Sequence, residues 1–534
     1  MKLNYKKVFL VGLAFFLISM FWQTYDNIIA KMLIDKFGLN QTWSGVVMAF
    51  DNILALFLLP LFGGLSDRTN AKLGRRTPYI IVGTIIAAFA FMALSFVDNY
   101  QTTKIESQTQ ITQDYETIQV ASLTDSEWNV IITGMASERV TALNAEQITQ
   151  KQYDTWDESI YQPMMDVLVK NTDGTLNTFE TNDLKDGYYS YLSTRAWQMT
   201  SQNPANFIVF IVVLFIALVA MSIFRSPAVA LMPDVTIKPL RSKANAIINL
   251  LGSFGGILSL IVLKLYGLDN QSYVNYTAAF ITIGALMLVF LAIFLYKVKE
   301  PKLVQEKEAD DIKYGLTDEV EAKILGETVE VLSKEKKVSL YLILFSVFLW
   351  FIGYNAVTSK FADYSPKVLQ LGYSTPLLVA YGTALLAFIP IGILATKIGR
   401  RKTILIGITI LTLCFAAATF LTPNSAQVMY LIFGLTGIGW ATINVNSYPM
   451  VVELSKNSNV GKYTGYYYTF SMAAQIITPI VSGMLMDKWG RIVLFPYAAI
   501  FVAFAFVTMF LVKHGDAVVP KKDSTLENFD VDMD

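Results

Sequence analysis

The sequence has little of what soluble proteins and metal enzymes depend on. Only 16% of its 534 residues are charged, and because the net charge is zero, nothing in the composition favours nucleic acid. Its single cysteine (Cys414) excludes an internal disulfide and a cysteine metal cluster, and it has one histidine (His514). No Gly-Lys-Ser/Thr loop for nucleotide phosphates is present. We therefore expect no enzymatic activity, no cofactor, and no catalytic or metal-binding residues.

Long apolar runs dominate what is present. Hydrophobic residues make up 54% of the chain, and they gather in segments of about 20 residues, the length that crosses a hydrocarbon core roughly 30 Å thick. We predict an all-α membrane protein with twelve transmembrane helices in two six-helix bundles. The predicted spans are residues 8–30, 43–62, 78–97, 206–232, 243–266, 275–297, 339–361, 375–396, 403–422, 426–451, 463–485 and 492–513.

Two long polar segments interrupt the spans. Residues 98–205 contain 16 acidic and 6 basic residues, and residues 298–338 are dense in charge. We expect the first to be a folded cap or spacer outside the membrane; the alternative is a part in gating or substrate capture. The predicted units are the N-terminal bundle (1–97 and 206–297), an extracellular insertion (98–205), a cytoplasmic linker (298–338), the C-terminal bundle (339–514) and an acidic tail (515–534).

Basic residues indicate the orientation. Lysine and arginine concentrate in the loops that follow spans 2, 4 and 8, and near the start of the chain. Because cytoplasmic loops carry an excess of these residues, we expect both termini to be cytoplasmic. The predicted location is the plasma membrane, which the chain crosses many times.

A charged turn lies between the second and third spans. It reads Gly63-Gly64-Leu65-Ser66-Asp67-Arg68 and continues to Gly74-Arg75-Arg76. A looser echo, Gly399-Arg400-Arg401, follows at an offset of 325, whereas Asp234 and Glu453 are offset by 219. The difference of 106 is nearly the length of the insertion, which indicates two related halves in one register.

These charges suit a gate. Gly63 and Gly64 would let helix ends approach closely, and Asp67 could accept hydrogen bonds from the N-terminus of a neighbouring helix. The arginines could pair with Asp234 or Glu453 in one arrangement of the halves and separate in the other; alternatively, the charges only set the topology. The candidate gating residues are Gly63, Asp67, Arg68, Arg75, Arg76, Asp234, Arg241, Arg400, Arg401 and Glu453.

Some charged residues fall within the predicted spans. Asp26, Asp51, Arg225 and Lys264 would each be costly in lipid, so each marks a cavity or a partner. We expect Asp26 or Asp51 to meet Lys264. Both aspartates are candidates for carrying a coupling proton, and a structural ion pair is the alternative.

Aromatic and amide side chains within the spans suggest a polar substrate. Sugars present apolar ring faces and a belt of hydroxyls, which aromatic rings, amides and carboxylates complement. We expect Trp22, Asp51 and Asn444 to share one cavity. The candidate substrate-binding residues are Trp22, Tyr25, Asp26, Asp51, Asn52, Arg225, Asn249, Trp350, Tyr354, Asn355, Trp440, Asn444, Asn446 and Gln475.

The turn resembles the signature loop of the major facilitator superfamily of transporters, in the pattern G-x-L-x-D-R-x(5)-G-R-R. The segments 226–234 and 461–465 resemble the sucrose–proton symporter-like branch, which is related to the glycoside–pentoside–hexuronide symporters. This resemblance implies two six-helix bundles, a central sugar site and proton-coupled uptake by alternating access. The branch's aspartate in the fourth span is matched here by Leu218, a departure that bears on the coupling ion and the sugar more than on the fold.

The predicted function is secondary active transport of a sugar, a disaccharide or other glycoside, by alternating access and coupled to protons. The expected partners are the sugar, a coupling cation and the lipid bilayer, with a monomer as the working unit and no nucleic acid. Two alternatives stay open: a drug–proton antiporter of the same fold, and a transporter-like sensor that uses the insertion. The identity of the sugar, and sodium in place of protons, also stay open.

Overall fold

The computed structural model describes residues 4–514 apart from 109–110, 121–122, 171–175, 177, 238–239, 270–272, 315–332 and 454–459. These described residues form helices and connecting turns, with no strand among them. Eleven of the described helices are long and apolar enough to cross a membrane, and the shorter apolar stretch Ser374–Phe388 belongs to a twelfth, α15 (Ser374–Ile398). The protein is therefore an all-α, multi-pass membrane protein, as predicted.

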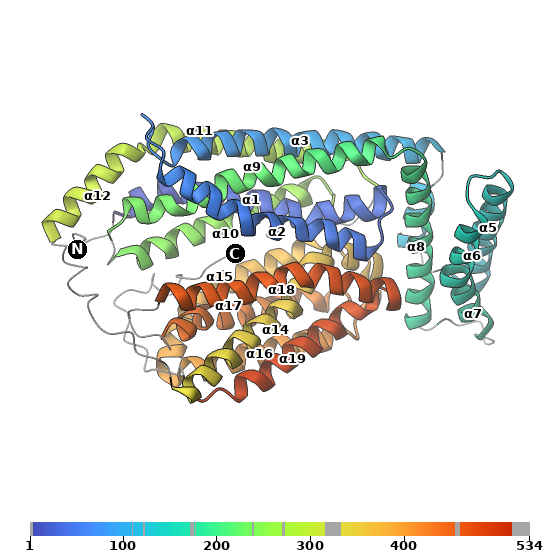
Figure 1. The fold of residues 1–534 in the computed structure, drawn as a ribbon. Coiled ribbons are helices and arrows are strands. Elements are labelled where there is room, and N and C mark those ends of the chain that lie inside the picture. The colour runs from blue at the N-terminus through green and yellow to red at the C-terminus, as the bar shows by residue number, and fades with distance from the viewer. Residues whose placement is uncertain are drawn as a thin grey trace.

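The N-terminal half contains six of these helices (Figure 1). They are α1 (Tyr5–Lys31) with its π-helical continuation η1 (Met32–Lys36), α2 (Gln41–Asp67), α3 (Thr77–Gln108), α9 (Ala205–Val235), α10 (Arg241–Leu265) and α11 (Thr277–Lys297). In lipid a backbone must satisfy its hydrogen bonds within its own helix, which is why each apolar run forms a single long helix. Within this half, α1 packs against α10 and α11, and α3 against α9 and α11.

The C-terminal half repeats the arrangement. Its helices are α14 (Lys334–Tyr364) with the continuation η4 (Ser365–Leu369), α15, α16 (Arg400–Ala418), α17 (Val428–Glu453), α18 (Val460–Trp489) and α19 (Leu494–Phe510). Here α14 packs against α18 and α19, while α17 packs against α15 and α16. Each of the twelve predicted spans overlaps one of these helices.

The two halves meet along α2 with α18, α10 with α15, and α1 with α14. Glycines permit the closest approach. A Cβ at Gly45 would lie 2.0 Å from the carbonyl oxygen of Pro479, and one at Gly483 would lie 2.3 Å from that of Gln41. Both approaches are near the start of α2, at the end of the molecule where α8 lies, and the halves diverge toward the end marked by α12 (Figure 1).

The insertion is helical and has its own aromatic core. It consists of α4 (Ile111–Val120), α5 (Asp125–Asn144), α6 (Gln150–Trp156), η2 (Asp157–Tyr161), α7 (Gln162–Lys170) and α8 (Thr178–Gln202). Trp128, Trp156 and Tyr191 are buried between these helices, whereas Trp197 is 42% exposed. The third membrane helix runs past the predicted end of its span, residue 97, as far as Gln108, so the insertion grows directly out of the bundle.

The linker between the halves begins as a helix. α12 (Glu300–Tyr314) follows α11 and packs against α9. Residues 315–332 of the predicted linker lie outside the described residues, as does the tail 515–534. α12 therefore belongs to the N-terminal half, whereas the last residues of the predicted linker, from Lys334, are part of α14.

Candidate substrate site

A cavity of about 280 Å³ lies between the two halves. Helices α1, α2, α9 and α10 line it from one half, and α14, α15, α17 and α18 line it from the other. Trp22, Asp51 and Asn444 share this cavity, as expected from the sequence. The other predicted binding residues that line it are Asp26, Asn52, Arg225, Tyr354, Asn355, Trp440 and Gln475.

The charged side of the cavity belongs to the N-terminal half. Asp26 and Asp51 interact electrostatically with Arg225, whose guanidinium lies 6.0 Å from the ring centroid of Trp22. Asp51 also accepts hydrogen bonds from the backbone and side-chain nitrogens of Asn52, at 2.6 and 2.8 Å. Charges at membrane depth are tolerated where they face a polar cavity and one another.

Lys264 is not the partner that the sequence suggested. Its ammonium donates a hydrogen bond to the Thr375 hydroxyl, across the interface between α10 and α15, near the end of the bundle. The pairing of Asp26 or Asp51 with Lys264 is therefore wrong in this conformation. Arg225 takes that place, since it interacts with both aspartates from a neighbouring helix.

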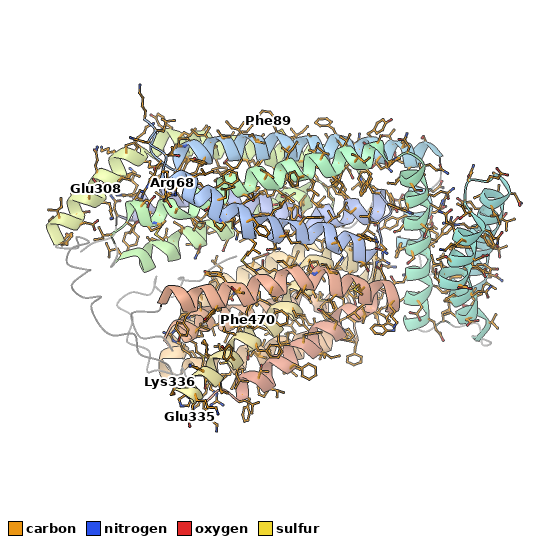
Figure 2. The ribbon with its side chains drawn as sticks, viewed as in Figure 1. Arg68, Phe89, Glu308, Glu335, Lys336 and Phe470 are labelled. Atoms are coloured by element: carbon orange, nitrogen blue, oxygen red, sulfur yellow. The ribbon has the colours of Figure 1, made fainter. Side chains whose placement is uncertain are left out.

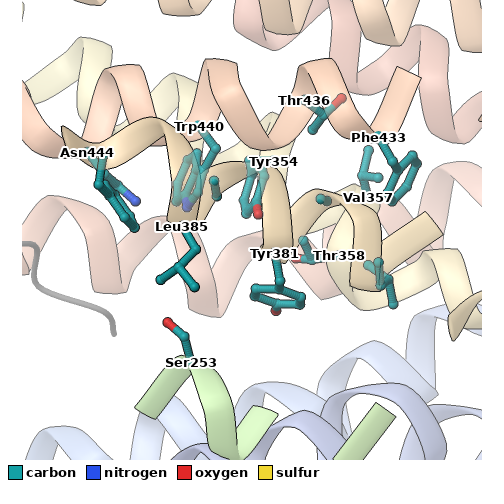
Figure 3. A pocket seen from close by; sticks show the side chains of 14 residues that line it. Ser253, Tyr354, Val357, Thr358, Tyr381, Leu385, Phe433, Thr436, Trp440 and Asn444 are labelled. Carbon is teal, nitrogen blue, oxygen red and sulfur yellow. The ribbon is translucent and has the colours of Figure 1, made fainter. Parts of the chain in front are cut away.

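The aromatic side of the cavity belongs to the C-terminal half (Figure 3). Tyr354 and Trp440 stack with ring centroids 3.6 Å apart and an interplanar angle of 3°. Phe351 packs edge-on against Trp440, at 5.3 Å. The two rings come from different helices, Tyr354 from α14 and Trp440 from α17.

Four predicted binding residues do not line the cavity. Tyr25 and Trp350 are fully buried in the packed interior, and Tyr25 lies behind Trp22 with ring centroids 5.2 Å apart. Asn446 is buried, and its amide donates to the carbonyl oxygen of Thr442 at 2.9 Å, while Asn249 is buried one turn before the lining residue Ser253. These side chains support the walls.

Several lining residues were missed by the sequence analysis. Gln23, Ser253 and Tyr381 line the cavity, as do the small residues Gly252 and Gly256. A Cβ at Gly256 would lie 3.4 Å from Oε1 of Gln23, an ordinary van der Waals distance, so these two lining residues are neighbours. Gln23 and Tyr381 could have been found from the sequence, because each is a polar side chain within a predicted span.

An apolar branch adjoins the cavity. It has a volume of about 50 Å³ and shares Tyr354, Tyr381, Trp440, Asn444 and other residues with the main cavity. Figure 3 shows Ser253 of the N-terminal half facing Tyr381 and Leu385 across this space. The lining residues that only the branch contains include Val357, Leu377, Ala380, Ala384 and Phe433. A polar chamber and a small apolar recess thus share one aromatic wall.

The charged turn between α2 and α3 forms an ionic network within the N-terminal half. Arg75 donates to Asp234 at 2.6 and 3.1 Å, and Nε of Arg76 donates to the same carboxylate at 2.7 Å. Arg76 also pairs with Asp67. The predicted pairing with Asp234 is present, but Arg75, Arg76 and Asp234 all belong to the N-terminal half, so these bonds do not link the two halves. Asp67 binds an arginine in place of a helix N-terminus.

The N-terminus of α3 is capped by a residue from the linker, which the sequence analysis missed. The Glu300 carboxylate accepts from the backbone nitrogens of Arg76 and Thr77, at 2.9 and 2.7 Å. A carboxylate is favourable there because the helix dipole places positive charge at that end. Gly74 has a φ of 104°, and a Cβ there would lie 2.3 Å from the Glu300 carboxyl carbon.

The other predicted gating residues have different surroundings. A Cβ at Gly63 would lie 2.8 Å from the Ser226 hydroxyl, so this glycine allows α2 to approach α9, whereas one at Gly64 would contact nothing within 4 Å. Arg68 is exposed (Figure 2), Arg400 is buried, and Arg401 donates to the carbonyl oxygen of Phe510. The side chains of Arg241 and Glu453 lie outside the described residues.

The Asp67→Ala variant is expected to insert normally and to transport poorly. Asp67 holds the guanidinium of Arg76, which also binds Asp234, so if the turn acts as a gate the initial uptake rate should fall about tenfold or more. Since the Asp67 side chain is 57% exposed, the stability of the fold should change little. The measurement is uptake into proteoliposomes per inserted protein, with Glu308→Ala as an exposed control on α12 (Figure 2). Normal uptake by Asp67→Ala would contradict a gating role.

Family comparisons match most of the chain. The model described as Major Facilitator Superfamily matches residues 191–389 and 377–529, and the model described as MFS/sugar transport protein matches residues 10–107. An uncharacterized MFS-type transporter, C18.02, of Schizosaccharomyces pombe is 31% identical over 169 residues, 31% of this chain and 36% of the relative. The sucrose transport protein SUC4 of Arabidopsis thaliana is 31% identical over 61 residues, 11% of this chain and 12% of the relative. The aligned segments thus span about a third or less of these relatives' lengths.

Solved structures share the architecture. The inward open conformation of the xylose transporter XylE from E. coli matches with a TM-score of 0.54 and 13% identity, and the match covers 98% of this chain and 99% of that chain. At this identity the likeness concerns the fold alone. Since the first family model alone spans well over half of the sequence, the chain belongs to the Major Facilitator Superfamily.

Proposed function

We propose that the chain is a secondary active transporter that takes up a sugar, a disaccharide or another glycoside, together with protons. The observation that carries this proposal is the cavity between the halves, which sets two carboxylates and an arginine opposite a stacked aromatic pair. Binding sites at the interface of two repeats suit alternating access, because rocking the halves exposes the same site to either side.

The walls of the cavity favour a sugar. The parallel rings of Tyr354 and Trp440 offer a flat apolar surface for one face of a pyranose. The amides of Asn52, Asn355 and Gln475 can both donate and accept hydrogen bonds, as ring hydroxyls require. The family description as a sugar transport protein and the local similarity to a sucrose transport protein support the same substrate class.

The carboxylates favour proton coupling. Asp26 and Asp51 both face the cavity and both interact with Arg225, so binding a proton to either one changes the charge balance around the arginine. A carrier of this kind moves only when its site is neutralised, since crossing the membrane with uncompensated charge is costly. One elementary charge moving through 100 mV contributes about 2.3 kcal/mol, enough for a useful concentration ratio.

The proposed topology makes this conformation inward-facing. With both termini cytoplasmic in the plasma membrane, the insertion lies outside and α12 inside. The closest contacts between the halves are at the outer end, at Gly45 and Gly483. The route from the cavity to solvent therefore leads to the cytoplasm, the state that releases substrate.

Uptake of labelled sugars into proteoliposomes tests the proposal. The purified chain is expected to accumulate a glycoside when the outside is made acidic and to lose accumulation when the pH gradient is collapsed. A parallel arm with sodium and no pH gradient identifies the coupling ion. Failure to accumulate any of a panel of mono- and disaccharides under either gradient would overturn the proposal.

A further inference from the structure

Helix α8 of the insertion lies across the ends of both halves, at the right of the bundle in Figure 1. It packs against η1 of the N-terminal half and η4 of the C-terminal half. The insertion is therefore more than a spacer attached to a loop. The question is which half α8 moves with when the halves separate.

The attachment of α8 to the N-terminal half is tight. Gly38, with a φ of 74°, lies so close to α8 that a Cβ would be 2.1 Å from the backbone nitrogen of Trp197 and 2.3 Å from the carbonyl oxygen of Ser193. The Gln101 amide donates to the Thr200 hydroxyl at 3.3 Å. Only residues 203–204 separate α8 from the membrane helix α9. Backbone packing and chain connection together make α8 a rigid extension of this half.

The attachment of α8 to the C-terminal half is ionic. The Asp186 carboxylate accepts from the backbone nitrogen of Arg491 at 2.7 Å and from its guanidinium at 2.8 Å. Both side chains are largely buried, with 12% and 6% exposed. Gly490, with a φ of 79°, leaves room for this carboxylate, because a Cβ there would lie 2.7 Å from Oδ2 of Asp186.

Arg491 connects this bond to a buried ionic network. Its Nε donates to Asp363 at 3.0 Å, and Lys367 donates to the same residue at 2.6 Å. Lys367 also pairs with Asp35 on η1, across the interface between the halves. The Tyr189 ring of α8 packs beside both cations, 5.5 Å from the Arg491 guanidinium and 5.7 Å from the Lys367 ammonium. The insertion thus supplies an anion and an aromatic face to a network that spans both halves.

The halves also touch directly at this end. The backbone nitrogens of Gln41 and Thr42 each donate to Asp487 at 2.8 Å, and the Lys360 ammonium donates to the carbonyl oxygen of Gln41 at 3.1 Å. These bonds close the entrance without the insertion. Asp186 and Tyr189 add a second set of contacts from a helix of the insertion.

We propose that α8 is a latch on the outer gate: the Asp186–Arg491 pair holds the halves together on the side of the insertion and must break each time that side opens. This inference rests on the proposed alternating-access cycle. When the halves separate, α8 stays with the N-terminal half, because backbone packing and the chain connection hold it there, while the side chains of Asp186 and Tyr189 hold it to the C-terminal half. The latch biases the resting protein toward the conformation in which the outer entrance is closed.

Distances between spin labels test the latch without any substrate. In a Cys414→Ser background, one label pair replaces Leu265 and Phe420 at the outer end, and another replaces Leu73 and Lys336 at the inner end; all four positions are exposed. Asp186→Asn is expected to add a population with a longer outer distance and a shorter inner distance. The ratio of outward-open to inward-open protein should rise about tenfold or more, as expected for losing a charged hydrogen bond.

The matched control is Asp183→Asn, an exposed aspartate on the same helix. It should leave both distances as they are in the parent. If Asp186→Asn gives the parent's distances at both ends, the latch is wrong. Because this readout needs no sugar, it can fail or succeed independently of the transport proposal.

A crosslink tests the same point in the other direction. The Asp186→Cys, Arg491→Cys pair in the Cys414→Ser background is expected to form a disulfide that stops transport until it is reduced. Full transport with the disulfide intact would show that the outer end opens while α8 stays attached to the C-terminal half, which would overturn the latch. If Asp186→Asn fails to fold, this experiment still decides the proposal.

Discussion

The Asp26→Asn or Asp51→Asn variant is expected to take up sugar only until the inside and outside concentrations are equal. Asparagine keeps the shape of aspartate and one of its acceptor oxygens, but it cannot gain or lose a proton. At 100 mV one coupled charge supports an accumulation ratio of about fifty, so in these variants the ratio of inside to outside sugar should fall to about one. The measurement is steady-state uptake into proteoliposomes with an acidic exterior.

Counterflow distinguishes the two aspartates. Exchange of labelled for unlabelled sugar requires binding and rocking but no net proton movement. The variant that loses accumulation and keeps exchange identifies the proton carrier, while a variant that loses both identifies a binding residue. Asp51 accepts two hydrogen bonds from Asn52, so its replacement is more disruptive to the local wall. Asp154→Asn, exposed on the insertion, is the control, and unchanged accumulation by both cavity variants would remove the aspartates from the coupling mechanism.

The sequence was enough to predict the helices and much of the cavity. An apolar run of about 20 residues has few alternatives to a membrane helix, so all twelve spans were found. A charge at membrane depth must face a cavity or a partner, and that argument placed Asp26, Asp51 and Arg225 correctly at the shared cavity. These predictions succeed because the free-energy cost of placing a charged residue in lipid depends on the type of that residue alone.

The sequence could not separate a cavity wall from a packed interior. Asn444 lines the cavity and Asn446 does not, although they are two residues apart on one helix and equally polar. The difference comes from which neighbouring helix each side chain faces. The same limit hid the network of Lys367 and Arg491, because only the fold places Asp186 of the insertion beside Arg491. Contacts between segments hundreds of residues apart leave no local pattern.

Glu300 shows the same difficulty at the inner end. It sits at the start of a charge-dense linker, where one more glutamate attracts no notice. In the fold its carboxylate caps α3 and lies against Gly74 of the charged turn. Arg76 of the turn and Glu300 of the linker are more than 220 residues apart in the sequence. Only the three-dimensional structure shows that they are bonded.

The Trp440→Ala variant is expected to bind sugar weakly while its coupling stays intact. Removing the indole takes away half of the stacked pair and leaves Tyr354 unsupported, since their ring centroids are only 3.6 Å apart. Losing an aromatic surface of this kind costs about 1.4 kcal/mol or more, which is a rise of at least tenfold in the half-saturation concentration. Trp440→Phe should recover most of the affinity, because a phenyl ring can still stack on Tyr354.

The accumulation ratio distinguishes a defect in sugar binding from a defect in folding. At saturating sugar, Trp440→Ala should reach the parent's ratio, since the proton-carrying carboxylates on the opposite wall are untouched. Trp197→Ala, which removes a partly exposed tryptophan of the insertion, should leave the half-saturation concentration unchanged. If Trp440→Ala kept the parent's affinity for every transported sugar, the aromatic wall would have no part in recognition, and the substrate would have to bind between the charged residues of the N-terminal half alone.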